Sequence, residues 1–303
     1  MESDSVAKHP REIMNQLCTH FGLTKLPFTL SPNTQFFVNL KTHQECFNTL
    51  VFALGTGEGF VKVTGEVGTG KTVLCRKLLN QLGGSEFVTA YIPNPAMPPE
   101  VLRRALAREL NVPESETLDH HQLIDRINDQ LIQNAKTDKK TVLVIDEAQA
   151  LPEDTLEEVR LLSNLETEQQ KLIQIVLFGQ PELDKLLLQD RFRQLRQRLA
   201  FAASLDTLDF GEMEQYVIQR MHFAGYNGGK VFDYGALKAL YKGTGGTPRL
   251  INVIAQKSLL VAFSQGQKMV TKSHVLKAVA DSDSVFKPKK RAFWKRLFKA
   301  KVA

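Results

Sequence analysis

The sequence predicts an α/β fold, in which helices flank a parallel sheet, followed by a small all-α domain and a basic tail. Three features lead to this prediction. Residues 65–72 form a glycine-rich turn between a strand pattern and a helix pattern, residues 141–145 have the composition of a strand buried on both faces, and strand patterns stop at about Asp209. The chain has 303 residues, 43% of them hydrophobic, which is enough for one large and one smaller domain.

Residues 65–72 match the phosphate-binding pattern G-x-x-x-x-G-K-[ST] at every fixed position. They follow the apolar run at residues 60–63 and lead into a helix pattern at residues 73–79, the context that the motif requires. Glycines let the backbone fold around an anion, so that successive N–H groups and the helix N-terminus point at phosphates. The predicted nucleotide-binding residues are Gly65, Glu66, Val67, Gly68, Thr69, Gly70, Lys71 and Thr72.

Two side chains of this loop carry chemistry. Lys71 can reach the β- and γ-phosphate oxygens, and the Thr72 hydroxyl is placed to ligate Mg²⁺. We therefore expect ATP and Mg²⁺ as ligands. Cys75 lies in the following helix and is expected to be a small buried apolar residue rather than a reactive thiol.

Two carboxylates end the buried strand. A continuous β-branched and aliphatic run precedes Asp146 and Glu147, and the carboxyl ends of strands are where open α/β sheets bind ligands. Asp146 can hold Mg²⁺ through its water shell, and Glu147 can take the proton from an attacking water. The alternative, a helix N-cap, does not account for this pair downstream of a phosphate loop.

Residues 172–180 form a further buried strand pattern, and Gln180 is its polar terminus. Gln180 would lie beside the γ-phosphate and could orient the water, although a polar loop residue is the simpler interpretation.

Four arginines follow close together. Arg191, Arg193, Arg196 and Arg198 could form a solvated helix face or bind nucleic acid phosphates. In an oligomeric ATPase, one of them would instead reach the γ-phosphate of a neighbouring subunit, and Arg198 is the first candidate, followed by Arg196.

The remaining pattern before Asp209 alternates helices and strands. Residues 1–16 show no periodic pattern and are expected to be a loose extension, and residues 21–37 form a loop rich in aromatics and prolines that is either core or a contact for a nucleotide base. A strand is expected at residues 87–92. Helices are expected at residues 43–54, 99–110, 119–133 and 156–165.

After Asp209 the patterns are helical. Helices are expected at residues 211–224, 234–241, 248–264 and 271–281. In the glycine-rich turn before the third, Thr247 is the expected cap and Pro248 the first helical residue. Arg249 then falls in the first turn, where the helix dipole disfavours a cation. We therefore expect Arg249 to contact the nucleotide phosphates.

The basic character of the chain is concentrated at its end. Residues 287–303 contain eight Lys or Arg and no acidic residue, and subtracting these eight charges from the net charge of +6 leaves −2 for the rest. Here Phe293, Trp294, Leu297 and Phe298 share one helix face, with cations opposite. This pattern is typical of a membrane-surface anchor, and a disordered solubilising tail or a nucleic-acid contact are the alternatives.

These motifs together resemble the AAA+ ATPases and, more closely, the ExeA/GspA-type family tied to type II secretion and type IV pili. The resemblance runs from about Phe21 to about Asp281. It rests on these residues: Phe21-Gly22-Leu23 with Pro27-Phe28, residues 65–72, Val144-Ile145-Asp146-Glu147-Ala148-Gln149, Phe178-Gly179-Gln180-Pro181-Glu182-Leu183, Leu195-Arg196-Gln197-Arg198 and Gly246-Thr247-Pro248-Arg249-Leu250-Ile251-Asn252.

The resemblance implies a role for each candidate residue. Lys71, Thr72 and Asp146 would hold nucleotide and Mg²⁺, and Glu147 would be the base. Gln180 would be the first sensor, Arg198 the finger acting in trans within an ATP-dependent ring or filament, and Arg249 the second sensor. The implied domains are an N-terminal extension (1–20), an AAA+ nucleotide-binding domain (21–208), a helical lid (209–284) and the basic amphipathic tail (285–303).

The expected function is that of an ATPase supporting assembly of a type IV pilus or a type II secretion complex, in the cytoplasm and peripheral on the inner membrane. No stretch of 18 apolar residues or secretory signal is evident, and the three cysteines lack metal-ligand spacing, which suits a reducing compartment. Within the family, the chain most resembles members that act in mannose-sensitive haemagglutinin (MSHA) pilus biogenesis. ExeA-like members have a membrane span and a peptidoglycan-binding domain, and neither is expected in this sequence. The alternatives are a DNA-binding AAA+ ATPase of the transposition-regulator kind and a nucleotide-dependent scaffold.

Overall fold

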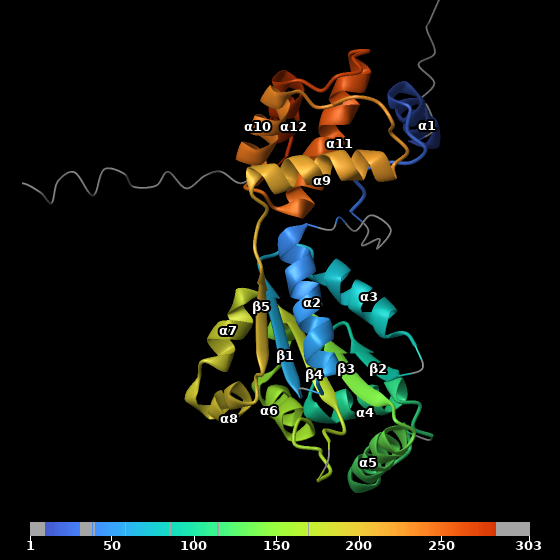
Figure 1. The fold of residues 1–303 in the computed structure, drawn as a ribbon, viewed down its shortest axis with the longest axis vertical. Coiled ribbons are helices and arrows are strands. Elements are labelled where there is room, and N and C mark those ends of the chain that lie inside the picture. Colours follow the sequence, from blue (N-terminus) through green and yellow to red (C-terminus); the bar gives the residue numbers. More distant parts are fainter. Residues whose placement is uncertain are drawn as a thin grey trace, which may run out of the picture. The chain divides into compact units, whose positions relative to one another are not determined.

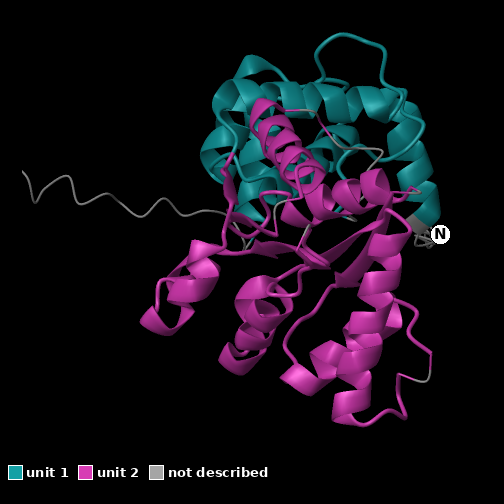
Figure 2. Ribbon diagram, turned by 60° about the horizontal axis from the view of Figure 1, so that its bottom comes forward, with its two compact units in different colours: residues 1–30, 208–303 teal, residues 31–207 magenta. Residues whose placement is uncertain are grey.

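The structure, a computed structural model, describes residues 10–30, 38, 40–57, 59–84, 86–113, 115–168 and 170–282. The chain divides into two compact units, residues 31–207 and residues 1–30 together with 208–303 (Figure 2). The expected amphipathic tail helix around Trp294 and the aromatics Phe36 and Phe37 lie outside the described residues. Within the described part of the chain, no helix is long and apolar enough to cross a membrane.

The α/β unit, residues 31–207, is built on a five-stranded sheet in which every pairing is parallel (Figure 1). The strand order is β2-β3-β4-β1-β5. The parallel sheet predicted from the sequence is therefore confirmed. The strands are β1 (Phe60–Gly65), β2 (Phe87–Ile92), β3 (Lys140–Ile145), β4 (Gln174–Gly179) and β5 (Phe201–Leu205).

Helices cover both faces of this sheet, and alternate residues of each strand supply the two cores. Along β3, Val142 and Val144 are buried with α2 and α3, whereas Leu143 and Ile145 are buried with the helices of the other face. Cys75 of α3 is fully buried, as predicted. One face carries α2 (Lys41–Gly55) and α3 (Lys71–Leu82), and the other carries α4 (Pro99–Glu109), α5 (His120–Lys136), α6 (Glu153–Leu162), α7 (Pro181–Leu187) and α8 (Arg193–Gln197).

The strand order determines where the polar motifs meet. Strand β4 pairs with both β1 and β3, so it lies between them. Since all three strands are parallel, the segments that follow them emerge at the same edge of the sheet. These segments are the phosphate loop, the pair Asp146 and Glu147, and Gln180.

The other unit, residues 1–30 together with 208–303, is helical. Its elements are α1 (Pro10–Phe21), α9 (Phe210–Phe223), α10 (Tyr234–Thr244), α11 (Pro248–Ser264) and α12 (Lys272–Ala280). The four helices expected after Asp209 are thus present. Thr247 precedes α11, but its side chain makes no capping hydrogen bond.

The expectation of a loose N-terminal extension is wrong from Pro10 onward. Residues 10–21 form α1, in which Leu17 is 3% and Phe21 4% exposed. The helix packs on α11, where the rings of His20 and Phe263 meet edge to face at 5.4 Å. The sequence carries the signal, since Ile13, Leu17 and Phe21 are spaced four residues apart and share a helix face.

Residues 22–30 also belong to the helical unit, although the sequence placed them in the nucleotide-binding domain. The backbone N–H of Thr24 donates to Ala224 O at 2.8 Å, and Nε of the buried Arg220 donates to Pro27 O at 2.7 Å. Phe28 is 2% exposed and packs edge to face on Phe232. Of the two interpretations of this aromatic segment, core packing therefore holds for Phe28.

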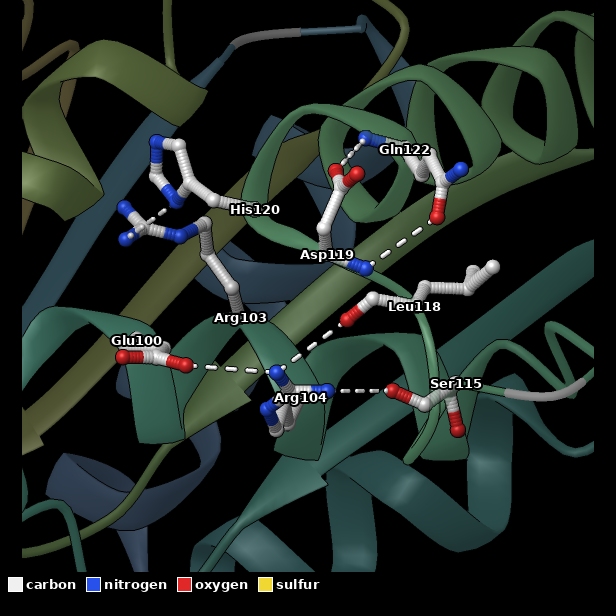
Figure 3. Close-up of polar contacts among 8 residues, drawn as sticks. All are labelled: Glu100, Arg103, Arg104, Ser115, Leu118, Asp119, His120 and Gln122. Atoms are coloured by element: carbon white, nitrogen blue, oxygen red, sulfur yellow. Dashed lines mark hydrogen bonds and ion pairs between the residues drawn. The ribbon is translucent and has the colours of Figure 1, made fainter.

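A polar cluster fixes the connection between α4 and α5 (Figure 3). Arg103 pairs with Glu158 of α6 at 2.6 Å, and its Nη2 contacts Nδ1 of His120 at 3.2 Å. Arg104 donates to the carbonyl oxygens of Ser115 (2.8 Å) and Leu118 (3.2 Å). Arg103 and Glu158 side chains are only 10% and 13% exposed, so this ion pair joins α4 to α6 largely away from water.

Removing the carboxylate of the Arg103–Glu158 pair should destabilise the α/β unit. We expect Glu158→Ala to lower the free energy of unfolding by about 3 kcal/mol, because it leaves a buried guanidinium without its counter-charge. The matched control is Glu100→Ala, which breaks the pair of Arg104 with the 61% exposed Glu100 and should cost less than about 1 kcal/mol. Urea unfolding of both variants measures the difference, and equal losses would contradict the prediction.

Candidate functional site

The glycine-rich loop connects β1 to α3 as the sequence predicted. Gly68 and Gly70 have φ of +84° and +105°, a backbone conformation that favours glycine. Helix α3 begins at Lys71, and the first N–H groups of a helix have no intrahelical acceptor. The loop and the helix start together present a set of N–H donors suited to an anion.

Lys71 lies inside this loop. It is 5% exposed, and its Nζ donates to Gly65 O at 2.7 Å and to Glu66 O at 2.9 Å. Burial lowers the pKa of Lys71, whereas the nearby carboxylates, first those of Glu147 and Asp146, oppose this shift. An ammonium has three N–H donors, so beyond these two bonds to described residues one donor remains for a phosphate oxygen.

Asp146 faces the phosphate loop. It continues the alternation of Val142 and Val144, whose side chains lie on the α3 face of the sheet. Its carboxylate is 3% exposed and accepts hydrogen bonds from the Thr72 hydroxyl and from the N–H of Glu147 at 2.9 Å. Burial raises the pKa of Asp146, and these hydrogen bonds oppose the shift. The buried carboxylate and hydroxyl are oxygen ligands of the kind that Mg²⁺ takes.

Glu147 occupies a left-handed backbone conformation, with φ of +51°, which is uncommon for a residue other than glycine. Its Oε2 accepts from Nε2 of Gln149 at 2.5 Å and from Nε2 of Gln180 at 3.2 Å. Oε1 of Gln149 in turn accepts the backbone N–H of Gln180 at 2.9 Å. The three side chains thus connect the end of β3 to the end of β4 and set the orientation of the Glu147 carboxylate.

Two residues at this site were not singled out from the sequence. Gln149 is one, and its position in the run that ends β3 is a signal that could have identified it. The other is His43 of α2, whose Nε2 lies 3.0 Å from the carbonyl oxygen of Thr69. No local pattern in the sequence indicates the contact of His43, because α2 and the phosphate loop are separated by a whole strand.

The candidate finger arginines lie at the amino ends of the parallel strands, whereas the phosphate loop lies at their carboxyl ends. Arg198 and Arg196 precede β5, whose first residue pairs with Val61 near the start of β1, and the phosphate loop follows the end of β1 (Figure 1). The five residues of β5 span about 16 Å. Nη1 of Arg198 donates to Ser163 O at 3.0 Å, and Nη1 of Arg196 donates to Leu187 O at 2.9 Å. Neither is part of its own chain's phosphate site.

Arg249 lies in the first turn of α11, as expected, and is exposed. It belongs to the helical unit, whereas the phosphate loop belongs to the other, so its contact with phosphates stays a prediction.

The sheet order, the loop and the paired carboxylates define a nucleotide-binding domain of the AAA class, and residues 54–187 match the family model described as AAA domain. The chain is 41% identical over 250 residues to General secretion pathway protein A of Aeromonas hydrophila, a match that covers 82% of this chain. The chain thus contains an AAA domain and is similar to an AAA+ protein of the ExeA/GspA type. It spans 45% of the length of that relative.

Solved structures share the fold at low sequence identity. Cdc6p from Pyrobaculum aerophilum matches with a TM-score of 0.64 and 20% identity, over 84% of this chain and 70% of its own. The ORC2 protein of Aeropyrum pernix, in a structure with ADPNP and ADP, matches with a TM-score of 0.60 and 15% identity, over 83% and 72%. At these identities the likeness concerns the fold alone, and it confirms the predicted fold class.

The close approach of Gly65 to β5 gives a prediction. A Cβ at Gly65 would lie 2.5 Å from Leu205 O and 2.9 Å from Oγ1 of Thr69, so Gly65→Ala must displace backbone. We expect it to cost about 1–3 kcal/mol of stability. In Gly84→Ala, by contrast, the added Cβ meets nothing within 4 Å. Thermal unfolding should show a lower midpoint for Gly65→Ala alone, and equal midpoints would contradict the geometry.

Proposed function

We propose that this chain is an ATP-hydrolysing AAA+ protein. The observation that carries the proposal is the meeting of Lys71, Thr72, Asp146 and Glu147 at one edge of the sheet. Lys71 has one ammonium donor left for a phosphate oxygen, and the loop and the start of α3 present N–H groups suited to an anion. Thr72 and Asp146 would hold Mg²⁺, which when bound would neutralise phosphate charge.

The side chains of this chain would then divide the work of hydrolysis. Lys71 and the loop N–H groups would hold the β- and γ-phosphates in place. Glu147 would accept the proton of the attacking water, once its carboxylate is turned from the two amides toward that water. Gln180, already hydrogen-bonded to Glu147, would orient the same water.

The separation of Arg198 from its own phosphate loop supports action between subunits. An arginine at the amino ends of the strands, away from its own phosphate loop, can neutralise γ-phosphate charge only in the site of a neighbouring chain. We therefore propose a head-to-tail homo-oligomer, a ring or a filament, in which Arg198 completes the site of the next subunit, with Arg196 as the second candidate. Arg249 would contact phosphates from the helical unit.

For the cellular role, we propose assembly of a type II secretion complex or of a type IV, MSHA-type pilus. The name of the relative from Aeromonas hydrophila supports the secretion role. The eight cations of residues 287–303 and their aromatic residues would attach the chain to an anionic membrane surface, with each cation contributing about 1 kcal/mol. Such attachment would place the protein in the cytoplasm, at the inner membrane.

A DNA-binding role has less support. Three arginines of the cationic stretch are engaged with protein groups: Arg191 with Glu153 at 2.5 Å, and Arg196 and Arg198 with backbone carbonyl oxygens. These contacts favour the structural and intersubunit interpretations of the stretch over binding to nucleic acid phosphates.

Steady-state ATP hydrolysis by the full chain tests the assigned base. We expect Glu147→Gln to lose at least about 100-fold in kcat while it still binds ATP, because an amide cannot accept the proton of the water. Lys71→Ala should lose ATP binding itself and serves as the blank. Undiminished turnover by Glu147→Gln would overturn the assignment.

The same ATP hydrolysis assay distinguishes the proposed membrane role from the DNA-binding alternative. Stimulation by anionic liposomes that disappears when residues 287–303 are removed would support the membrane role. Stimulation by duplex DNA that survives this removal would favour the DNA-binding alternative instead.

Mixing two inactive variants tests the intersubunit arginine. Arg198→Ala keeps its own phosphate loop, and Lys71→Ala keeps its arginine, so a mixed oligomer contains complete sites. In an equal mixture roughly a quarter of the interfaces combine an intact loop with an intact neighbouring arginine, and activity should return to that level. Arg193→Ala, at the exposed first residue of α8, the helix that Arg198 follows, is the control and should stay active. A mixture as inactive as its components would contradict action in trans.

A further inference from the structure

A histidine outside the residues matched by the AAA domain model contacts the phosphate loop. His43 of α2 is 6% exposed, and its Nε2 lies 3.0 Å from the carbonyl oxygen of the fully buried Thr69. A carbonyl oxygen can only accept a hydrogen bond, so Nε2 must carry the proton and donate it. The match to the family model begins at residue 54, so His43 lies outside it.

The hydrogen bond from His43 to Thr69 O also determines the direction of the N–H group of Gly70. The peptide between Thr69 and Gly70 is a planar trans unit in which the C=O and the N–H point in opposite directions. Since His43 holds the C=O toward α2, the N–H of Gly70 points away from α2. The N–H of Gly70 belongs to the residue that caps α3, where an anion is favoured.

The space around Gly70 matches the histidine. Gly70 has φ of +105°, and a Cβ there would lie 3.1 Å from Nε2 of His43, tighter than an ordinary contact. The imidazole therefore fills the volume that a side chain at position 70 would need. The loop conformation and the position of His43 depend on each other.

We propose that His43 is a positioning residue for the phosphate loop, which holds the Thr69–Gly70 peptide so that its N–H faces the β-phosphate of a bound nucleotide. This inference rests on the proposed nucleotide binding. It assigns to α2 an indirect part in nucleotide binding, through one hydrogen bond to the loop backbone.

Two substitutions separate the hydrogen bond from packing. His43→Leu fills a similar volume without a donor, whereas His43→Gln places an amide nitrogen the same number of bonds from Cβ as Nε2. We expect His43→Leu to raise the Kd of ADP about tenfold, ~1.4 kcal/mol, by calorimetry. His43→Gln should bind ADP with the Kd of the wild-type protein, because its amide nitrogen restores a donor to Thr69 O.

A second measurement needs no nucleotide. Amide hydrogen exchange of residues 66–72 in nucleotide-free protein should be faster in His43→Leu and restored in His43→Gln, because the donor orders the loop directly. Unchanged exchange and ADP affinity in His43→Leu would overturn the proposal, as would a His43→Gln variant impaired as much as His43→Leu. If the unchanged chain binds ADP no better than Lys71→Ala, the proposed function fails, and the exchange measurement still decides whether His43 orders the loop.

Discussion

The parallel pairing of β4 with both β1 and β3 is the constraint on which the candidate site depends. Because of it, three segments far apart in the chain end at one edge of the sheet: the phosphate loop, Glu147 with its neighbour, and Gln180. The alternation of β3 then turns the Asp146 carboxylate to the α3 face, where it meets the Thr72 hydroxyl. The amides of Gln149 and Gln180 hold Glu147 from the other strand end.

Burial disfavours the charged forms of both Lys71 and Asp146. It lowers the pKa of the Lys71 ammonium and raises that of the Asp146 carboxylate, so each group is destabilised in its charged form. An anion beside Lys71 and a cation beside Asp146 would relieve both effects at once. This electrostatic arrangement suits a ligand that carries both charges, as a nucleotide with its magnesium ion does.

The sequence was most informative where a local pattern determines the chemistry. The glycine loop, the hydrophobic run before Asp146 and the helices after Asp209 could all be predicted, because period and composition suffice for them. The contact of His43 with Thr69 could not, since it arises only when α2 packs over the loop. Strand β5 was missed because Ala202, Ala203 and Ser204 give a weak strand pattern, and α1 because its apolar positions lie within a polar segment.

The attachment of α1 and residues 22–30 to the helical unit bears on how the chain is made. The α/β unit is inserted between the two parts of the helical unit. Helix α1 therefore leaves the ribosome before the sheet, whereas its partner α11 follows only after the whole sheet has been synthesised. Leu17 and Phe21 cannot be buried until then. During synthesis the α/β unit can fold as soon as β5 has emerged, whereas the helical unit must wait until α9 to α12 have followed.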